Sequence, residues 1–116
     1  MHVLLADDNL EIRSALHLLL DELGHSISDA ADVSGLFAQL QKGPVDMLLL
    51  DWELPGFIPG THMHDIRLKN PRCVVVAMSG RPEARAESGR LGAETFVCKS
   101  DSPDALLRIL RETPTR

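Results

Sequence analysis

The sequence predicts an α/β fold: a three-layer α/β/α sandwich built on a five-stranded parallel sheet with five helices. Short apolar runs typical of strands alternate with segments of helical periodicity along all 116 residues. Such alternation implies a parallel sheet, and right-handed crossovers then place helices on both of its faces. The length is that of one domain, and 44% apolar with 25% charged residues is the balance of an ordinary globular protein.

The chain begins with a strand and the most regular helical pattern in the sequence. Residues 2–6 (HVLLA) stop at Asp7 and Asp8, which predicts a buried strand followed by a helix that Asp8 or Asn9 caps. Gly24 ends this helix in a left-handed conformation. Its apolar stripe consists of Ile12, Leu16, Leu19, Leu20 and Leu23.

A second strand and helix lead into the most apolar strand. Residues 26–30 form a weak strand candidate, and the following helix stops at Gly43 and Pro44. That helix carries Val33, Leu36, Phe37 and Leu40. Residues 45–50 contain three consecutive leucines and predict a strand buried on both faces, which ends at Asp51.

The second half of the chain repeats the pattern. A turn-rich loop leads into a helix that carries Met63, Ile66 and Leu68 and ends at Asn70 and Pro71. The β-branched run at residues 73–78 predicts a strand, and residues 82–91 predict a marginal helix. A short strand follows at residues 95–98. Ser102 with Pro103 caps the last helix, whose apolar residues are Leu106, Leu107, Ile109 and Leu110.

Charge and composition exclude several functions. The net charge is −5 and the basic residues form no stripe, so we expect no direct nucleic-acid binding by this domain. Apolar runs are too short for a membrane span, and no secretory signal is present. Cys73 and Cys98 lie in apolar segments without a metal-binding spacing, which favours free, buried thiols in a reducing cytoplasm. We therefore expect a cytoplasmic protein with no membrane contact.

Polar residues gather where the predicted strands end. Asp7 and Asp8 follow the first strand, and Asp51, Ser79 and Lys99 follow the third, fourth and fifth. In a flavodoxin-like sheet of order 2-1-3-4-5 the first and third strands are neighbours at the switch point, so the three carboxylates share one pocket. Such a cluster needs a cation, and Mg²⁺ with open coordination positions suits it. With a lysine and a hydroxyl nearby, these are the parts of a phosphoryl-transfer site.

Over essentially its whole length the chain resembles the receiver domain of two-component response regulators, which has the CheY-like fold. The matching pieces are the acidic pair in LLADDN, DWELPG around Asp51, Ser79 followed by Gly80, and Lys99 in FVCKS. Each piece is weak alone, but their order and spacing are specific. The resemblance assigns residues 1–112 to the receiver and 113–116 to a C-terminal tail or the start of a linker.

The resemblance implies that Asp51 is the nucleophile. It would take a phosphoryl group from the phosphohistidine of a sensor histidine kinase or a phosphotransfer protein. Asp8 and Asp51 would hold Mg²⁺ together with the backbone carbonyl of Glu53, and Asp7 would act mainly through water. The domain would catalyse its own phosphorylation and dephosphorylation, as a signalling switch rather than a conventional enzyme.

The resemblance also implies how the switch works. Ser79 and Lys99 would each contact a phosphoryl oxygen, and Phe96 stands where the family keeps its switch aromatic. Movement of Ser79 and Phe96 would remodel the face made by the fourth helix, fifth strand and fifth helix, which would bind a downstream effector protein or domain. The sequence leaves open whether the domain forms a homodimer on phosphorylation and which kinase acts on it. It also leaves open whether the domain is part of a longer, DNA-binding regulator.

The chain departs from the family pattern beside this site. Ser100 follows the lysine where the family usually has proline, and the loop at residues 51–60 is one residue longer than usual, with Pro59 where an acidic residue is frequent. In the receiver geometry that the resemblance implies, Glu53 and Arg81 would overhang the phosphoryl position from two neighbouring strand ends. Opposite charges there could pair, and we expect them to tune the lifetime of the phosphoryl group.

Two other functions stay open from the sequence. A receiver-like module could bind partners independently of phosphorylation, although all five site groups are present here. A small phosphatase with an aspartyl nucleophile is the other alternative, but its usual second aspartate is replaced by Glu53. Individually, Asp7 and Asp8 could be helix caps, and Phe96 could belong to the core.

Overall fold

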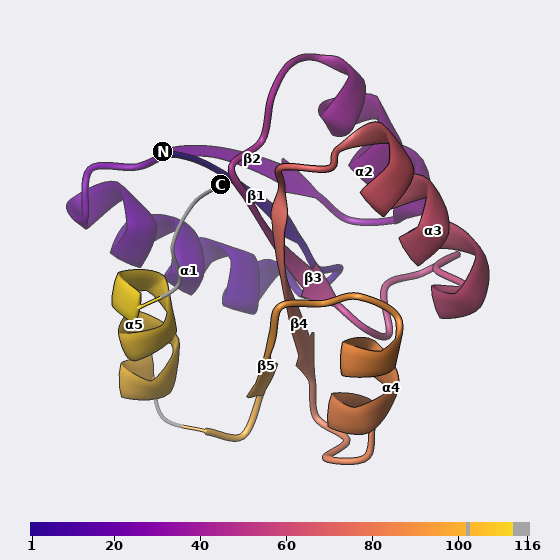
Figure 1. The fold of residues 1–116 in the computed structure, drawn as a ribbon. Coiled ribbons are helices and arrows are strands. Elements are labelled where there is room, and N and C mark those ends of the chain that lie inside the picture. The colour runs from indigo at the N-terminus through magenta and orange to yellow at the C-terminus, as the bar shows by residue number, and fades with distance from the viewer. Residues whose placement is uncertain (102, 113–116) are drawn as a thin grey trace.

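The computed structural model describes residues 1–101 and 103–112, and within them five parallel strands alternate with five helices (Figure 1). The strands are β1 (His2–Ala6), β2 (Ser26–Ala30), β3 (Met47–Asp51), β4 (Val74–Ser79) and β5 (Thr95–Cys98). The helices are α1 (Leu10–Glu22), α2 (Val33–Gln41), α3 (Pro59–Lys69), α4 (Ala84–Arg90) and α5 (Pro103–Glu112). The strand order is β2-β1-β3-β4-β5, which confirms the predicted architecture.

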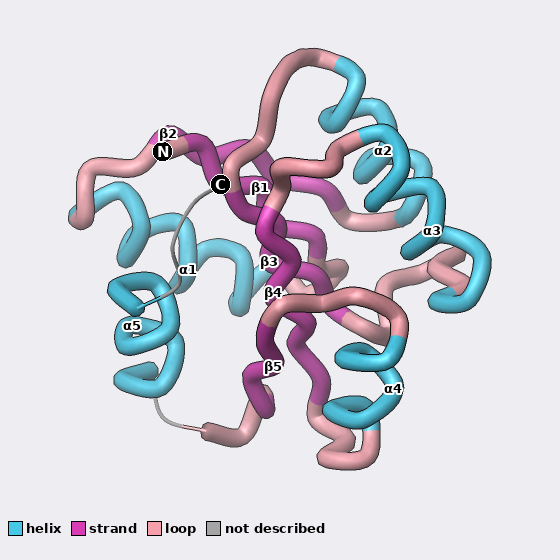
Figure 2. Tube along the Cα trace, viewed as in Figure 1, coloured by secondary structure: helices cyan, strands magenta, loops and turns pink. Residues whose placement is uncertain are grey.

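The helices form two layers, one on each face of the sheet. Helices α1 and α5 cover one face and α2, α3 and α4 cover the other (Figure 2). Along β3, Leu48 and Leu50 pack into the core under α2, α3 and α4, whereas Met47 and Leu49 pack under α1 and α5. Every residue of β3 and β4 is buried, because both faces of these strands are covered. The ends of these strands are therefore held still.

The first two helices start with side-chain caps. Asn9 is the N-cap of α1, since its side chain accepts a hydrogen bond from the Ile12 amide at 3.0 Å. Of the two candidates in the sequence, Asn9 and not Asp8 therefore caps this helix. Asp32 caps α2 in the same way, and Gly24 follows α1 with a φ of 85°, as predicted.

Some element boundaries differ from the predicted ones. β3 begins at Met47 and β4 at Val74, slightly later than expected, and β4 extends to Ser79. Helix α4 begins at Ala84, because the Ala84 and Arg85 amides bond three residues back, to Arg81 and Pro82, in a turn rather than an α-helix. Leu68 of α3 is exposed, outside the buried stripe. The expected Ser102 cap and the 113–116 tail lie outside the described residues.

The two cysteines are free but differ in burial. Cys73 is buried, and burial raises the pKa of its thiol to about 12. The expectation of a buried thiol is wrong for Cys98, which is only half-buried because it ends β5, a strand at the edge of the sheet.

Among the described residues, every helix is too short or too polar to cross a membrane.

Candidate functional site

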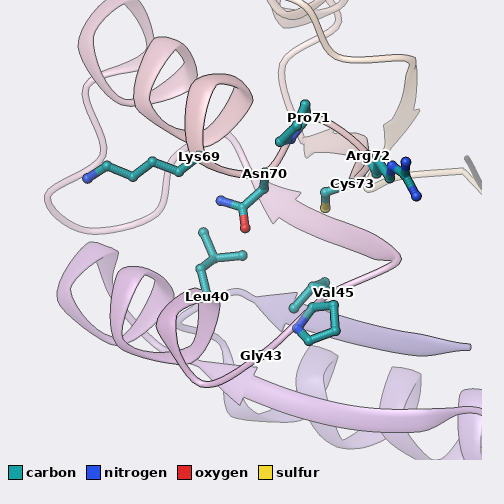
Figure 3. A pocket seen from close by; sticks show the side chains of 9 residues that line it. Leu40, Gly43, Val45, Lys69, Asn70, Pro71, Arg72 and Cys73 are labelled. Atoms are coloured by element: carbon teal, nitrogen blue, oxygen red, sulfur yellow. The ribbon is translucent and has the colours of Figure 1, made fainter.

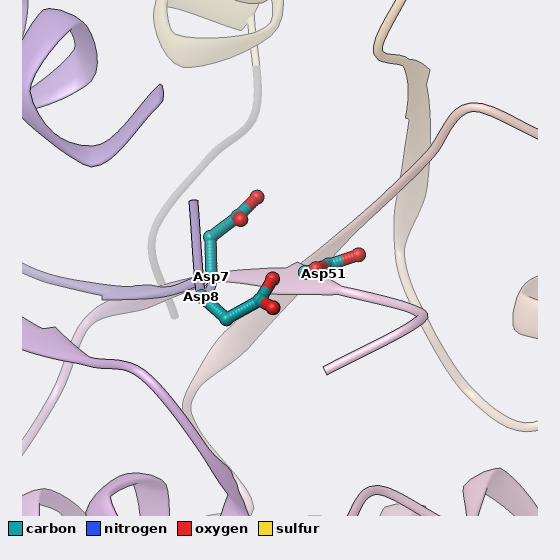
Figure 4. Close-up of side chains that lie close together, drawn as sticks. All are labelled: Asp7, Asp8 and Asp51. Atoms are coloured by element: carbon teal, nitrogen blue, oxygen red, sulfur yellow. The ribbon is translucent and has the colours of Figure 1, made fainter. Parts of the chain in front are cut away.

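Three carboxylates meet at the carboxyl ends of two neighbouring strands. Asp7 and Asp8 directly follow β1, and Asp51 is the last residue of β3 (Figure 4). The strands pair in parallel with Ala6 opposite Leu50, so the residues that follow these two lie next to each other. One carboxylate oxygen from each aspartate lies within 4.8 Å of the other two. The sequence prediction that these residues share one pocket is consistent with this geometry.

Asp51 is held in a buried turn. Its side chain is 3% exposed, and its Oδ1 accepts a hydrogen bond from the Glu53 amide at 3.0 Å. The Trp52 amide bonds to the Met78 carbonyl of β4 at 2.7 Å, which fixes the chain directly after the aspartate. Burial raises the pKa of Asp51, and the charge of Asp7 adds to this, while the Glu53 amide and Lys99 act in the opposite direction. A nearby cation therefore stabilises the ionised form of Asp51.

Lys99 supplies one such cation from the far side of the pocket. Its Nζ lies 2.6 Å from Asp7 Oδ2 and 3.2 Å from Asp51 Oδ1. The Lys99 amide donates to the Ser79 carbonyl at 2.8 Å, which places this lysine at the end of the sheet. Burial disfavours the charged ammonium, but the hydrogen bond to Asp7 and the charge of Asp51 outweigh burial and raise the pKa of Lys99. Lys99 is therefore charged at neutral pH.

The pocket retains an excess of negative charge that fits a divalent cation. Asp7, Asp8 and Asp51 carry three negative charges, and Lys99 offsets one of them. Asp7 and Asp51 are buried whereas Asp8 is exposed. Carboxylate oxygens clustered at this distance, with one side open to solvent, are ligands that Mg²⁺ binds while keeping several waters. The donor set therefore suits Mg²⁺.

Ser79, Glu53 and Arg81 form a hydrogen-bonded cluster beside the aspartates. The Ser79 hydroxyl donates to Glu53 Oε1 at 2.7 Å and accepts from the Arg81 amide at 3.0 Å. Arg81 Nη2 lies 3.0 Å from Glu53 Oε2, so the pair that the sequence allowed is formed. The sequence reasoning missed the contact between Glu53 and Ser79. The only signal for this contact was that the two residues lie beside Asp51 on adjacent strands. Glu53 is two residues after Asp51, and Ser79 follows Met78, which pairs with Asp51.

Two aromatic residues link the site to α4. Phe96 is buried in the core under α2, α3 and α4, and the guanidinium of Arg85 lies 4.8 Å from its ring centroid. Trp52, directly after Asp51, is buried and donates a hydrogen bond from Nε1 to Glu87 of α4. The sequence reasoning did not find this second connection, because nothing in the local pattern pairs a tryptophan with a residue 35 positions away.

A separate cavity of about 350 Å³ lies at the opposite edge of the sheet, before β3 and β4 (Figure 3). The side chains of Lys69 and Arg72 extend in different directions there rather than toward a common point. Its lining residues are Leu40, Gly43, Pro44, Val45, Lys69, Asn70, Pro71, Arg72 and Cys73. The charged groups that converge lie at the carboxyl edge, and the chemistry belongs there.

The loop that carries Lys99 differs from the family pattern in sequence. Ser100 follows the lysine, and its Oγ lies 3.0 Å from Cys98 Sγ. Within residues 1–101 and 103–112 no peptide bond is cis, so Lys99 and Ser100 are joined by a trans peptide. The Asp101 amide bonds to the Cys98 carbonyl at 2.9 Å and closes a turn after β5.

A parallel sheet of this order, with an acidic cluster, a hydroxyl and a lysine at its carboxyl edge, defines the class of CheY-like signalling domains. The chain belongs to the response regulator receiver domain family, whose sequence profile matches residues 3–111. It is thus a receiver domain of the two-component response regulators.

Individual relatives agree with this assignment. The transcriptional regulatory protein QseB of Escherichia coli O157:H7 is 30% identical over 111 residues, covering 94% of this chain and 49% of that protein. The phosphate regulon transcriptional regulatory protein PhoB of E. coli K12 is 27% identical over 119 residues, covering 98% of this chain and 52% of that protein. The chain therefore spans about half the length of the curated relatives it matches.

Solved structures have the same fold. The response regulator TrrA of Thermotoga maritima, in complex with Mg²⁺ and BeF, matches with a TM-score of 0.84 and 25% identity, covering 95% of this chain and 96% of that one. The chemotaxis response regulator CheY4 of Vibrio cholerae matches with a TM-score of 0.85 and 24% identity, covering 95% of each chain. The second likeness shows the fold alone.

Proposed function

We propose that Asp51 accepts a phosphoryl group from the phosphohistidine of a sensor histidine kinase or a phosphotransfer protein. The observation that carries this proposal is the buried Asp51 carboxylate, fixed at the end of β3 with Lys99 3.2 Å away. A carboxylate oxygen of Asp51 attacks phosphorus, the bond from phosphorus to the histidine nitrogen breaks, and an aspartyl phosphate forms. A rigid strand end suits this role, since in-line attack needs a fixed nucleophile.

Mg²⁺ is the cation that we assign to the pocket. Asp8 and Asp51 would hold it together with the backbone carbonyl of Glu53, and Asp7 would act through water. When bound, Mg²⁺ supplies positive charge that offsets the negative charge developing on the phosphoryl oxygens. Lys99 supplies further positive charge from the opposite side, where it already contacts Asp7 and Asp51. Together these positive charges would allow an anionic phosphodonor to approach the anionic carboxylate of Asp51.

Ser79 and Phe96 are the switch residues in this proposal. Ser79 moves toward a phosphoryl oxygen, and Phe96 moves into the space that Ser79 vacates. The face formed by α4, β5 and α5 then binds a downstream effector protein or domain, and homodimerisation through it stays open. The proposal places the domain in the cytoplasm, with no membrane contact and no nucleic acid bound directly. The assignment of residues 1–112 to the receiver, and of the residues after them to a tail or the start of a linker, stays a prediction.

We assign Glu53 and Arg81 a role in the lifetime of the phosphoryl group. Their ion pair lies beside Ser79 and restricts the approach of an attacking water. Glu53→Ala and Arg81→Ala should each change the rate of autodephosphorylation several-fold, and the double variant should be less than additive because both changes break one pair. Phosphate release at saturating Mg²⁺ measures this, and equal rates for the wild type and both single variants would contradict it.

Labelling with acetyl phosphate tests the proposed function. The wild-type protein with Mg²⁺ should gain one acid-labile phosphoryl group, while Asp51→Asn or a chelator should abolish the gain. A module that works without phosphorylation would take up no label. An aspartyl phosphatase would instead hydrolyse phosphate esters over many turnovers, so the same assay extended to a phosphate ester separates the three functions.

A further inference from the structure

The cluster of Ser79, Glu53 and Arg81 points to a step that must precede switching. We propose that the Glu53 carboxylate competes with the phosphoryl group: it binds the Ser79 hydroxyl in the unphosphorylated protein and must release it before Ser79 can bind phosphorylated Asp51. Glu53 is thus a positioning residue that acts through Ser79. This inference rests on the function proposed above.

The hydrogen bonds of Ser79 carry the argument. A serine hydroxyl has one proton, so it donates one hydrogen bond at a time. Ser79 donates that bond to Glu53 Oε1 at 2.7 Å, and its oxygen accepts from the Arg81 amide at 3.0 Å. A bond from Ser79 to a phosphoryl oxygen therefore replaces the bond to Glu53 and cannot be added to it.

Glu53 presents its two oxygens as a phosphoryl group would. Oε1 accepts from the Ser79 hydroxyl, and Oε2 lies 3.0 Å from Arg81 Nη2. Two anionic oxygens that bridge a hydroxyl and a guanidinium are the arrangement that a phosphate also makes with such donors. The unphosphorylated protein thereby satisfies its switch hydroxyl with an anion of its own.

Burial makes the exchange between the two anions a two-state event. Ser79 is fully buried, so its hydroxyl is costly to leave without an acceptor. The side chains of Glu53 and Arg81 are 42% and 53% exposed, so Glu53 can release Ser79 while it stays paired with Arg81. Phosphorylation of Asp51 adds negative charge beside Glu53, which repels the carboxylate while offering Ser79 a new anionic acceptor.

The affinity for beryllofluoride, measured through Trp52 fluorescence at saturating Mg²⁺, tests this competition. The variants are Glu53→Ala, Glu53→Asp and Glu53→Gln. Aspartate keeps the charge but is one methylene too short to reach Ser79, whereas glutamine keeps the length and an acceptor oxygen. We expect alanine and aspartate to tighten binding about tenfold, which corresponds to one hydrogen bond to a charged group, and glutamine to tighten it less.

A matched control separates capture of Ser79 from loss of a nearby charge. Glu83 is also an exposed glutamate beside Arg81, at 3.8 Å from Nη1, but it does not contact Ser79 in the structure. Glu83→Ala should leave the affinity unchanged. In a Ser79→Ala background, Glu53→Ala should change the affinity for beryllofluoride less than it does in the wild type, because no hydroxyl remains to be released.

Three results would overturn the inference. If alanine and glutamine tighten binding but aspartate does not, charge repulsion alone explains the effect. If the wild type and all three variants bind beryllofluoride equally, Glu53 does not compete. If none of them binds it and acetyl phosphate also fails to label the wild type, the proposed function itself is wrong, and this inference falls with it.

Discussion

At the scale of single residues, burial divides the site into two kinds of carboxylate. Asp7 and Asp51 are buried and share the ammonium of Lys99, whereas Asp8 is exposed at the mouth of the pocket. Burial makes the negative charge of Asp51 unfavourable, and the proposed phosphoryl transfer requires that charge. The structure therefore gives up stability at Asp51, and that loss can be measured.

Replacing Asp51 by asparagine should stabilise the protein at neutral pH. The pKa of Asp51 is raised in the folded state, so its contribution to stability is present below the unfolded pKa, near 3.9, and is lost as pH rises through the folded pKa. Asparagine lacks the charge and should raise the free energy of unfolding by about 1 kcal/mol at pH 7. Urea unfolding should show this gain shrinking as pH falls through the folded pKa and disappearing below about pH 4; a gain that is constant with pH would contradict the cause.

Replacing Lys99 by alanine should destabilise the protein when Mg²⁺ is absent. The change leaves Asp7 and Asp51 buried without their shared cation, and we expect a loss of about 2 kcal/mol, reduced because Lys99 is partly exposed. Added Mg²⁺ should recover part of this loss, since it binds the same carboxylates. Urea unfolding with and without Mg²⁺ measures both effects. The exposed Lys42→Ala is the control, and an equal response of the two variants would refute the account.

At the scale of elements, the weakest predicted helix is connected to two aromatic residues near the site. Helix α4 has seven residues, and it receives a hydrogen bond from Trp52 through Glu87 and packs Arg85 over Phe96. The sequence showed its marginal character through Gly89 and its few large apolar residues. Its late start came from turn hydrogen bonds at Arg81 and Pro82, which depend on local geometry rather than on hydrophobic periodicity.

Helix α3 is fixed to the sheet by a charged pair that should contribute to stability. Arg67 donates to the Glu94 carboxylate and to the Cys73 carbonyl, and Glu94 also accepts from the Val75 amide at 2.6 Å. Arg67→Ala leaves a largely buried carboxylate without this partner, so we expect a loss of about 2 kcal/mol. Chemical denaturation measures it, with exposed Arg72→Ala as the matched control. Equal midpoints for the two variants would show that the pair contributes nothing.

At the scale of the whole molecule, the alternation of strands and helices could be predicted because it follows from local patterns, whereas the sheet order, and with it the meeting of the three aspartates, was expected from the order of flavodoxin-like sheets. Each strand has its own apolar run, and each acidic residue follows such a run. The contact between Glu53 and Ser79 follows from the register of β3 against β4, which no local pattern specifies. The exposure of Cys98 likewise depends on β5 lying at an edge, a property of the assembled sheet.

The two cores on opposite faces of the sheet explain why function concentrates at one edge. They bury β3 and β4 completely and hold the strand ends as a rigid frame, while the half-exposed Glu53 and Arg81 remain able to move. A rigid acceptor beside movable side chains is what a phosphorylation switch requires. The central claim is therefore chemical: the phosphoryl group is carried by Asp51.

Trapping the phosphorylated residue tests that claim most directly. Borohydride reduces an aspartyl phosphate to homoserine, and peptide mass spectrometry then locates the modified position after treatment with acetyl phosphate and Mg²⁺. The account predicts homoserine at residue 51, in the peptide that contains Trp52, and none in protein kept without the phosphodonor. Homoserine at residue 7 or 8 instead, or unmodified Asp51 in protein that has incorporated phosphate, would contradict it.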